Sequence, residues 1–404
     1  MFLPDVAVTV ELDAEAFAAI SLLATPHRAR DLRLALIAEF NRNFTLAETE
    51  VLLHELAERA AVITRTSAAL PTPARQSPSH APESVHLQLN NICNLRCPSC
   101  YVTLDKEDAG SLPLDRIVAL IKEWAEMGVF QLALGGGEAL MSAKFVPVVH
   151  AARQCGIVPN VTTNGWLITE LLLDQVQGSL GELRMSLNDF VTVNVPVLEA
   201  KASLMRARGM RFGFNLIATR CNLNRLNGLV TWACAQGAAT INLIRPKPAP
   251  GNERWYEENV LRGVDASHLA SILNRLEPLF GPTALTVDCG FSFLFEGQAG
   301  NELKARGVAG CAMGERLATV KWNGDVYPCS HLRGEQFKAG SVMTESFAAI
   351  WERSGVFKKV RRDLAKVTGS CAGCGHNSFC KGCRAVMWQQ TSDWLAADTD
   401  CGLS

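Results

Sequence analysis

The chain has fourteen cysteines among its 404 residues, and their spacing is the first feature that could do chemistry. Three of them, Cys93, Cys97 and Cys100, form the pattern C-x3-C-x2-C. Three thiolates in one loop can ligate three irons of a [4Fe–4S] cluster, which leaves the fourth iron open. An open position on a metal accepts an exchangeable ligand and so indicates chemistry rather than scaffolding. A zinc site is the alternative, but the first histidine downstream that could complete it is the distant His150.

A second set of cysteines lies near the C-terminus: Cys311, Cys329, Cys371, Cys374, Cys380, Cys383 and Cys401. Between the first two, Asn323-Gly324 is flanked by ATVKW and DVYPC, which predicts a β-hairpin with a type I′ turn. The two C-x2-C pairs of this set also fit a zinc knuckle. Of the four remaining thiols, Cys155, Cys221 and Cys234 are predicted to be small core residues.

The N-terminal sequence and the composition limit the cellular compartment and the classes of partner that we expect. The N-terminus has no basic start, Asp5 interrupts its apolar stretch, and no apolar run reaches about 18 residues, so neither a signal peptide nor a membrane span is predicted. We therefore expect a cytoplasmic protein with reduced thiols, in which clustered cysteines hold metals or catalyse. Lys plus Arg is 39 and Asp plus Glu is 40. Without a basic excess, no nucleic-acid partner is expected.

The elements that position these residues follow from periodicity. Strand-like apolar runs alternate with helical segments such as 114–127 and 222–236, which predicts βαβ units and a parallel sheet. The six runs are 85–90, 130–135, 158–163, 183–187, 212–219 and 241–244. Six such units suit an incomplete barrel or an open sheet, whose active site lies at the carboxyl ends of the strands. The three-cysteine loop follows the first run, and a Gly-Gly-Gly-Glu sequence follows the second.

These motifs resemble those of the radical S-adenosylmethionine (radical SAM) superfamily. CNLRCPSCY matches its C-x3-C-x-aromatic-C motif in spacing, although Ser99 precedes the third cysteine and the aromatic residue follows it as Tyr101. GGGEAL matches the GGE motif, with Ala139 where proline is usual. TTNG and SLND match strand-end motifs of the same branch. The resemblance covers roughly residues 85–250.

The resemblance implies an α/β fold with a partial (β/α)6 barrel over residues 85–305. The three-cysteine loop would hold a [4Fe–4S] cluster whose open iron binds SAM. A flavodoxin- or ferredoxin-type protein would reduce it, and a 5′-deoxyadenosyl radical would abstract a substrate hydrogen. The SAM contacts would be Gly135, Gly136, Gly137 and Glu138 at the methionine amino end, Thr163 and Ser186 near the ribose and carboxylate, and Tyr101 near the adenine. Ordinary strand-end capping is the alternative for Thr163 and Ser186.

The second cysteine set, within residues 306–404, resembles the SPASM extension of these enzymes, which carries two auxiliary iron–sulfur clusters. The last spacing of the central run is x2 instead of the usual x3, a variant associated with members acting on peptides and on tetrapyrrole-type precursors. Carried over by motif position, one cluster would be ligated by Cys371, Cys374, Cys380 and Cys401. The other would be ligated by Cys311, Cys329 and Cys383. Cys289 is the nearest upstream thiol for its missing ligand, and an open or non-cysteine position is the favoured alternative.

Further polar residues are candidates for the site. In sulfatase-maturing SPASM enzymes an Asp follows the cysteine corresponding to Cys329 and serves as base, whereas Ser330-His331 follows here. This departure counts against that activity and makes His331 a candidate catalytic acid or base, with a surface histidine as the alternative. Arg220 and Arg245, at the ends of the last two runs, could hold a SAM or substrate carboxylate. The alternative for both is a structural ion pair.

Residues 1–66 precede a proline-rich linker at 67–84 and predict a small α+β module. A strand-like stretch at 6–12 is followed by helical patterns at 28–40 and 45–60. Several SPASM enzymes carry an N-terminal module with a similar order that binds the leader of a substrate peptide. A leader can bind by adding a strand to a sheet edge. A helical accessory or dimerisation unit is the alternative.

The leading hypothesis is thus a radical SAM/SPASM enzyme that modifies a ribosomally synthesised precursor peptide. The product would be a thioether, a carbon–carbon crosslink, an epimer or a decarboxylated residue. The second hypothesis is a radical SAM enzyme of cofactor or tetrapyrrole biosynthesis. The third is a non-catalytic iron–sulfur electron carrier.

Overall fold

The computed structural model describes residues 2–3, 8–9, 81–102, 104–105, 107, 110–187, 191–276, 283–295, 310–377 and 380–401. The chain falls into two compact units, residues 1–75 with 299–306 and residues 76–298 with 307–404. Both cysteine sets belong to the second unit. In the first unit, β1 (Phe2–Leu3) pairs antiparallel with β2 (Val8–Thr9). The predicted helices at 28–40 and 45–60, and most of the predicted linker, lie outside the described residues.

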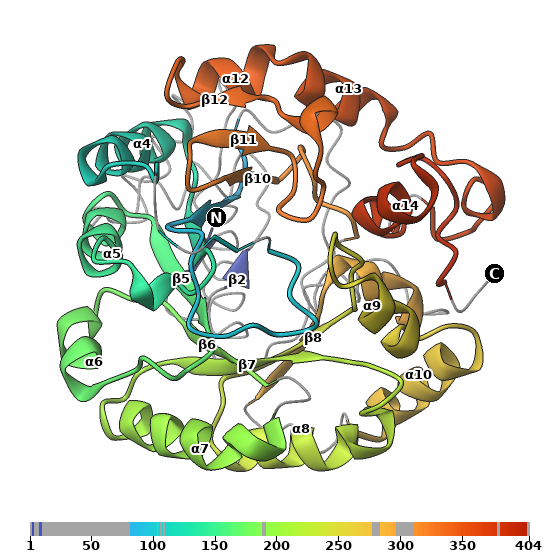
Figure 1. The fold of residues 1–404 in the computed structure, drawn as a ribbon, viewed down its shortest axis with the longest axis horizontal. Coiled ribbons are helices and arrows are strands. Elements are labelled where there is room, and N and C mark those ends of the chain that lie inside the picture. The colour runs from blue at the N-terminus through green and yellow to red at the C-terminus, as the bar shows by residue number, and fades with distance from the viewer. Residues whose placement is uncertain are drawn as a thin grey trace, which may run out of the picture. The chain divides into compact units, whose positions relative to one another are not determined.

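All six predicted strands form, and each pairs in parallel with the next. They are β3 (Ser84–Gln88), β4 (Gln131–Gly135), β5 (Val158–Thr163), β6 (Leu183–Ser186), β7 (Phe212–Ile217) and β8 (Thr240–Ile244). A further strand that was not predicted, β9 (Ala284–Val287), pairs in parallel with β8. Figure 1 shows the curved sheet with helices around its outside. This is the partial barrel that the sequence predicted.

The helices of the barrel lie between these strands: α4 (Leu114–Met127), α5 (Phe145–Gln154), α6 (Glu170–Val176), α7 (Val191–Ala207), α8 (Leu226–Ala235), α9 (Glu253–Asn259) and α10 (Val264–Leu276). The first of them has the bounds that the sequence predicted. It ends because Gly128 takes a left-handed conformation, with φ of 92°. Its buried residues Ile117, Leu120, Ile121 and Trp124 recur at helical spacing. The apolar stripe therefore holds this helix on the sheet.

The two faces of the sheet differ because successive strand side chains point to opposite sides. On the helix side Phe214 packs against Trp232 of α8, with ring centroids 5.1 Å apart. On the other face, Asn215 donates to Thr162 and accepts from Asn242, at 3.1 and 3.2 Å. The inner face thus carries hydrogen-bonding side chains in place of the branched apolar layers that fill a closed barrel.

The C-terminal part continues the same sheet. The predicted hairpin forms from β10 (Leu317–Val320) and β11 (Asp325–Tyr327), with β12 (Gly340–Ser341) beside it. β10 also pairs in parallel with β3, so the sheet order is β12-β11-β10-β3-β4-β5-β6-β7-β8-β9. The remaining helices are α12 (Phe347–Arg353), α13 (Gly355–Asp363) and α14 (Arg384–Thr391).

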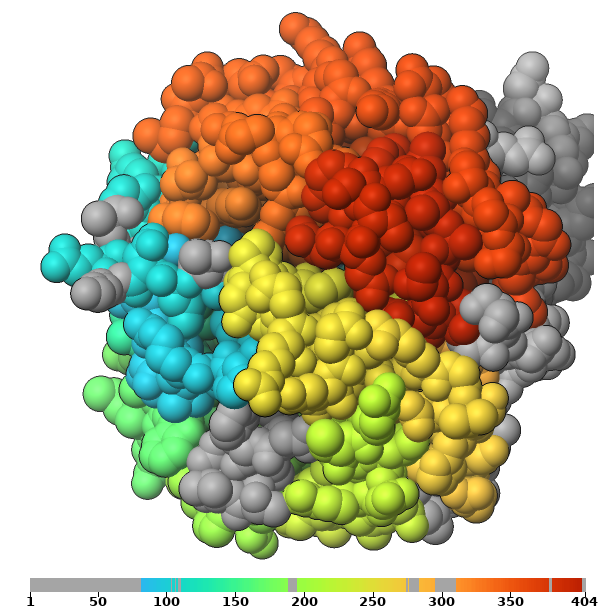
Figure 2. Space-filling view, turned by 45° about the vertical axis from the view of Figure 1, so that its right-hand side comes forward, coloured from blue at the N-terminus to red at the C-terminus, as the bar shows by residue number. Residues whose placement is uncertain are grey.

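Short 3-10 turns occupy several strand ends and loops: η1 (Ala139–Met141), η2 (Leu223–Arg225), η4 (Cys289–Phe295), η5 (Glu335–Phe337) and η6 (Gly369–Cys371). In Figure 2 the C-terminal segment, in red, packs beside the yellow segment that includes α9. Hydrogen bonds from Tyr256 and Arg262 to Asp400 join these two segments. None of the helices in the described ranges has the length and apolar character needed to cross a bilayer.

Candidate functional site

The three-cysteine loop directly follows β3, and its thiols lie close together. Burial, followed by the charges of Cys100 and Cys93, raises the pKa of Cys97 to about 11. Burial also raises the pKa of Cys93, with further contributions from Glu138 and Cys100. Backbone N–H groups of Leu95 and Val102 donate to the sulfurs of Cys93 and Cys100, each at 3.4 Å. Three converging thiols whose protons a metal would replace fit an iron–sulfur cluster.

The glycine motif after β4 packs against the residues just before this loop. A Cβ at Gly137 would lie 2.1 Å from the carbonyl oxygen of Ile92, so no larger residue fits. Gly136 has φ of 148°, and a Cβ there would lie 2.8 Å from the carbonyl oxygen of Asn90. The Gly137 N–H donates to Asn90, and the Glu138 N–H donates to Ile92. Two motifs that the sequence separates by about forty residues are therefore bonded together.

Glu138 joins a third motif to the other two. Its carboxylate is 1% exposed and accepts from the backbone N–H groups of Leu140 and Asn164, at 3.0 and 2.8 Å. Burial raises the pKa of Glu138 in spite of these bonds. The Asn164 side chain then donates to Asn94 in the cysteine loop, at 2.8 Å. The side chain of Glu138 thus fixes the strand-end loops, and its predicted contact with the SAM amino group stays a prediction.

The other predicted SAM contacts differ in their burial and in their hydrogen-bond partners. Thr163 is buried, and its hydroxyl accepts from the N–H of Gly165 at 3.1 Å, which is the predicted capping alternative. Ser186 ends β6 and is half-buried. Arg220 donates to Asp265 at 3.1 Å, with its side chain 47% exposed. This pairing favours the structural ion pair for Arg220.

Tyr101 connects the cysteine loop with the C-terminal part. Its ring centroid lies 4.1 Å from that of His331, and the guanidinium carbon of Arg333 lies 5.6 Å from it. The Nδ1 of His331 is inaccessible to solvent and has no hydrogen-bond partner among the described residues. Burial, followed by the charges of Lys247 and Arg333, holds the pKa of His331 well below its usual value. His331 is thus half-buried with its Nδ1 enclosed, and its role as acid or base stays a prediction.

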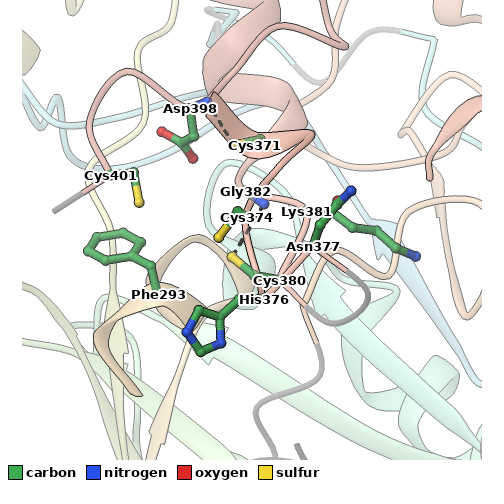
Figure 3. A pocket seen from close by; sticks show the side chains of 10 residues that line it. All are labelled: Phe293, Cys371, Cys374, His376, Asn377, Cys380, Lys381, Gly382, Asp398 and Cys401. Carbon is green, nitrogen blue, oxygen red and sulfur yellow. Dashed lines mark hydrogen bonds between the residues drawn. The ribbon is translucent and has the colours of Figure 1, made fainter. Parts of the chain in front are cut away.

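The four thiols predicted for one auxiliary cluster line a single pocket. Figure 3 shows the sulfurs of Cys374, Cys380 and Cys401 turned toward the same space. The lining residues are Phe293, Cys371, Cys374, His376, Asn377, Cys380, Lys381, Gly382, Asp398 and Cys401. Two backbone N–H groups donate to sulfur at 3.4 Å, Gly382 to Cys380 and Asp398 to Cys371. Four cysteines with such donors around one pocket are a set that fits an iron–sulfur cluster.

The CKGC spacing has a local conformational basis. Lys381 and Gly382 both take left-handed backbone conformations, with φ of 58° and 59°. This sharp turn directs Cys380 into the pocket of Figure 3, whereas Cys383 is buried in the core with Cys311. The Cys311 N–H also donates to the carbonyl of Cys380 at 3.3 Å, so the two thiol sets are adjacent.

The thiols of the other set also interact. Burial, followed by a backbone hydrogen bond that opposes it and by the charges of Cys329 and Cys383, brings the pKa of Cys311 to about 12. Burial, with Asp288, Cys311 and Cys383, raises the pKa of Cys289 well above its usual value. Cys289 therefore interacts electrostatically with two thiols of this set, Cys311 and Cys383. Among the described residues, no three His, Cys, Asp or Glu side chains are arranged to hold a single metal ion.

Several expectations for isolated residues need correction. Cys221 is exposed, because it lies in the turn between β7 and η2, whereas Cys155 and Cys234 are half-buried. Arg245 is a structural ion pair, since its guanidinium makes two bonds of 2.7 Å to Asp398. Asp398 was missed in the sequence. The available signal was the acidic D-x-D sequence directly before Cys401.

Two family models match this chain. The radical SAM superfamily model matches residues 87–200, and the SPASM iron–sulfur cluster-binding domain matches residues 311–375. Mycofactocin maturase of Mycobacterium tuberculosis (strain CDC 1551 / Oshkosh) is 26% identical over 335 residues, which are 80% of this chain and 83% of the relative.

Two other relatives match a similar share. The AdoMet-dependent heme synthase of Methanosarcina barkeri (strain Fusaro / DSM 804) is 24% identical over 356 residues, covering 80% of this chain and 97% of the relative. The PqqA peptide cyclase of Xanthomonas campestris pv. campestris (strain B100) is 26% identical over 348 residues, covering 79% and 86%.

A solved structure shares the fold. SuiB of Streptococcus suis, bound to its precursor peptide SuiA, matches with a TM-score of 0.71 and 15% identity, over 99% of this chain and 95% of that one. The strand-end motifs, the two thiol sets and the two matched models lead to one assignment. The chain carries a radical SAM domain over residues 87–200 and a SPASM iron–sulfur cluster-binding domain over residues 311–375.

Proposed function

We propose that this protein is a radical SAM enzyme that modifies a ribosomally synthesised peptide. The observation that carries the enzymatic role is the bonding of three motifs, from the ends of β3, β4 and β5, into one group of loops. The peptide substrate is supported by the relatives called mycofactocin maturase and PqqA peptide cyclase, and by the SuiB complex with a precursor peptide. The modification is a thioether, a carbon–carbon crosslink, an epimerisation or a decarboxylation.

The residues have separate tasks in this proposal. Cys93, Cys97 and Cys100 hold the four-iron cluster and leave one iron for SAM. When bound, these cofactors supply the one-electron chemistry that removes a hydrogen atom from the substrate. Gly137 allows the backbone to approach closely, and Glu138 fixes the loops against one another. The ring of His331, enclosed beside Tyr101, is our candidate for a substrate contact, since its Nδ1 has no partner among the described residues.

The auxiliary clusters use the two C-terminal thiol sets. One is held by the pocket set, Cys371, Cys374, Cys380 and Cys401, and the other by Cys311, Cys329 and Cys383. Auxiliary clusters accept the electron that remains after the new bond forms. A flavodoxin- or ferredoxin-type protein supplies the reducing electron. Because ligation needs reduced thiols, we place the enzyme in the cytoplasm.

Anaerobic incubation tests this function. The reconstituted full chain is given SAM, dithionite and a synthetic candidate precursor peptide, and the products are analysed by mass spectrometry. We expect 5′-deoxyadenosine together with a mass change in the peptide. The matched control replaces Cys93, Cys97 and Cys100 by Ala and should form neither. An intact enzyme with full iron content that forms no 5′-deoxyadenosine would make the chain an electron carrier instead.

A tetrapyrrole substrate is the second candidate, favoured by the match to the AdoMet-dependent heme synthase. The same incubation with an iron-bearing tetrapyrrole in place of the peptide separates the two. Peptide-dependent turnover without tetrapyrrole turnover supports the first candidate, and the reverse supports the second.

We also propose that residues 1–66 bind the leader of the peptide, from their predicted order of one strand followed by helices. Fluorescence anisotropy with the full chain compares a labelled peptide with and without its leader. Removal of the leader should weaken binding at least about tenfold, which corresponds to about 1.4 kcal/mol. Equal affinities would favour an accessory role for this module.

A further inference from the structure

Three of the predicted ligands of the first auxiliary cluster follow from motif position, and the fourth position is undetermined. The sequence favoured an open or non-cysteine group there. Cys289, which lies 22 residues before Cys311, belongs to none of the matched motifs. It begins η4, directly after β9 and Asp288.

Hydrogen bonds place the Cys289 turn beside Cys383. One nitrogen of Arg245, Nη1, donates both to the carbonyl of Gly290 at 3.0 Å and to Asp398 at 2.7 Å. The same oxygen of Asp398 accepts from the backbone N–H of Cys383 at 2.8 Å. A single guanidinium nitrogen and a single carboxylate oxygen therefore connect the residue after Cys289 with Cys383.

A second contact fixes the turn itself. Asp288 accepts from the Gly290 N–H at 2.6 Å and from the Arg245 N–H at 3.2 Å, and it pairs with Lys247. Its carboxylate is therefore engaged with the backbone and with Lys247. Cys289 interacts electrostatically with Cys311 and Cys383, and Cys329 interacts with Cys383. Lys247 also interacts with Cys289, Cys329 and Cys383, so one buried cation lies near three of these thiols.

We propose that the Cys289 thiolate is the fourth ligand of the first auxiliary cluster, beside Cys311, Cys329 and Cys383. Four cysteine ligands leave no iron of this cluster open to substrate. The cluster then exchanges electrons and does not bind the peptide. The inference rests on the ligand sets of the proposed function, and it is independent of which substrate the enzyme modifies.

The test uses a background in which Cys93, Cys97 and Cys100 are replaced by Ala, so that only the auxiliary clusters remain. Iron and sulfide are counted after anaerobic reconstitution, and electron paramagnetic resonance spectra of the reduced protein are recorded with and without cyanide, a ligand for open iron. With Cys289 present, we expect about eight irons, from two clusters of four, and no cyanide-dependent signal. In the added C289A variant, either one cluster signal becomes sensitive to cyanide or about four irons are lost.

C234A, which removes a thiol outside both sets, is the matched control and should behave like the background. A cyanide-dependent signal in the protein with Cys289 intact overturns the proposal, as does a C289A variant that is indistinguishable from C234A. The cyanide measurement on the background protein needs no further cysteine variant. It therefore tests the proposal even where C289A assembles poorly. Failure of the proposed function is seen separately, since an unaltered protein that binds about twelve irons and forms 5′-deoxyadenosine but leaves the peptide unchanged contradicts only the substrate.

Discussion

At the scale of single residues, Gly137 shows how closely the loops approach. An added Cβ would meet the Ile92 carbonyl oxygen at 2.1 Å, and backbone atoms cannot move aside as a flexible side chain can. We expect Gly137→Ala to displace the loop that carries Cys93 and to weaken SAM binding at least about tenfold. Equilibrium dialysis with SAM on reconstituted protein measures this, with the iron content checked alongside.

The control for this substitution is Gly228→Ala. Gly228 lies in α8, and a Cβ added there would meet no atom within 4 Å. Alanine there should stabilise the helix by about 1 kcal/mol and leave SAM binding unchanged. Unaltered SAM affinity in G137A would show that the close approach of Gly137 is not needed for the cofactor.

The burial of His86 leads to a prediction about how the stability depends on pH. Burial lowers the pKa of His86 to about 4, against 6.5 for an ordinary histidine. Because its pKa is depressed in the folded state, the unfolded chain takes up the proton first as pH falls. The stability that the neutral His86 contributes is therefore fully present above about pH 6.5. About 3 kcal/mol of this contribution is lost as the pH falls from about 6.5 to 4. Urea unfolding at pH 7 and pH 4.5 measures the loss.

Other groups titrate in the same range, so the comparison is between variants. His86→Gln should reduce the loss of stability between the two pH values, whereas His268→Gln, at an exposed position of α10, should leave it unchanged. An H86Q variant with the same pH dependence as the unaltered protein would contradict the burial of a neutral His86.

At the scale of elements, Arg245 fastens the end of β8 to the loop after α14. It bonds Asp398 and Asp400, and the side chains of all three are almost completely buried. Removal of one partner from a buried ion pair leaves uncompensated charge and costs about 3–5 kcal/mol. We expect Arg245→Met to lower the free energy of unfolding by about this amount, as measured by chemical denaturation.

Arg254→Met is the matched control, because Arg254 pairs with Glu258 on the surface of α9 and its side chain is 91% exposed. Such pairs contribute at most about 1 kcal/mol, so this variant should differ little from the unaltered protein. Similar effects for the two variants would mean that the buried pair does not fasten these elements.

At the scale of the whole molecule, the cluster ligands come from segments far apart in the chain. The thiols follow β3, begin η4 and lie on both sides of α14, so bound clusters connect the barrel with the C-terminal part. Binding to the folded state alone stabilises it by mass action. We expect the reconstituted protein, with about twelve irons from three clusters of four, to melt at a higher temperature than the iron-free protein.

Scanning calorimetry under anaerobic conditions measures the two melting temperatures. The variant without Cys93, Cys97 and Cys100 should keep most of the difference, because its auxiliary clusters remain. Equal melting temperatures with and without iron would indicate that the clusters do not connect the two parts.

Much of the fold was predictable because its signals are local. The six parallel strands follow from apolar runs, α4 follows from its stripe and its terminal glycine, and the hairpin follows from Asn323-Gly324. The grouping of the pocket thiols was given by the family resemblance and not by spacing, because Cys380 and Cys383 share a C-x2-C spacing yet belong to different sets. The strands, the helix and the hairpin each depend on side chains only a few residues apart.

The sequence by itself thus determined the barrel strands, the three-cysteine loop and the family. Only the tertiary structure decided that β10 joins β3, that Arg245 pairs with Asp398, that His331 is enclosed beside Tyr101, and that Cys289 lies with Cys383. The physical reason is sequence separation. These contacts join segments more than ninety residues apart, and no local pattern of hydrophobicity or spacing records which distant surfaces pack together.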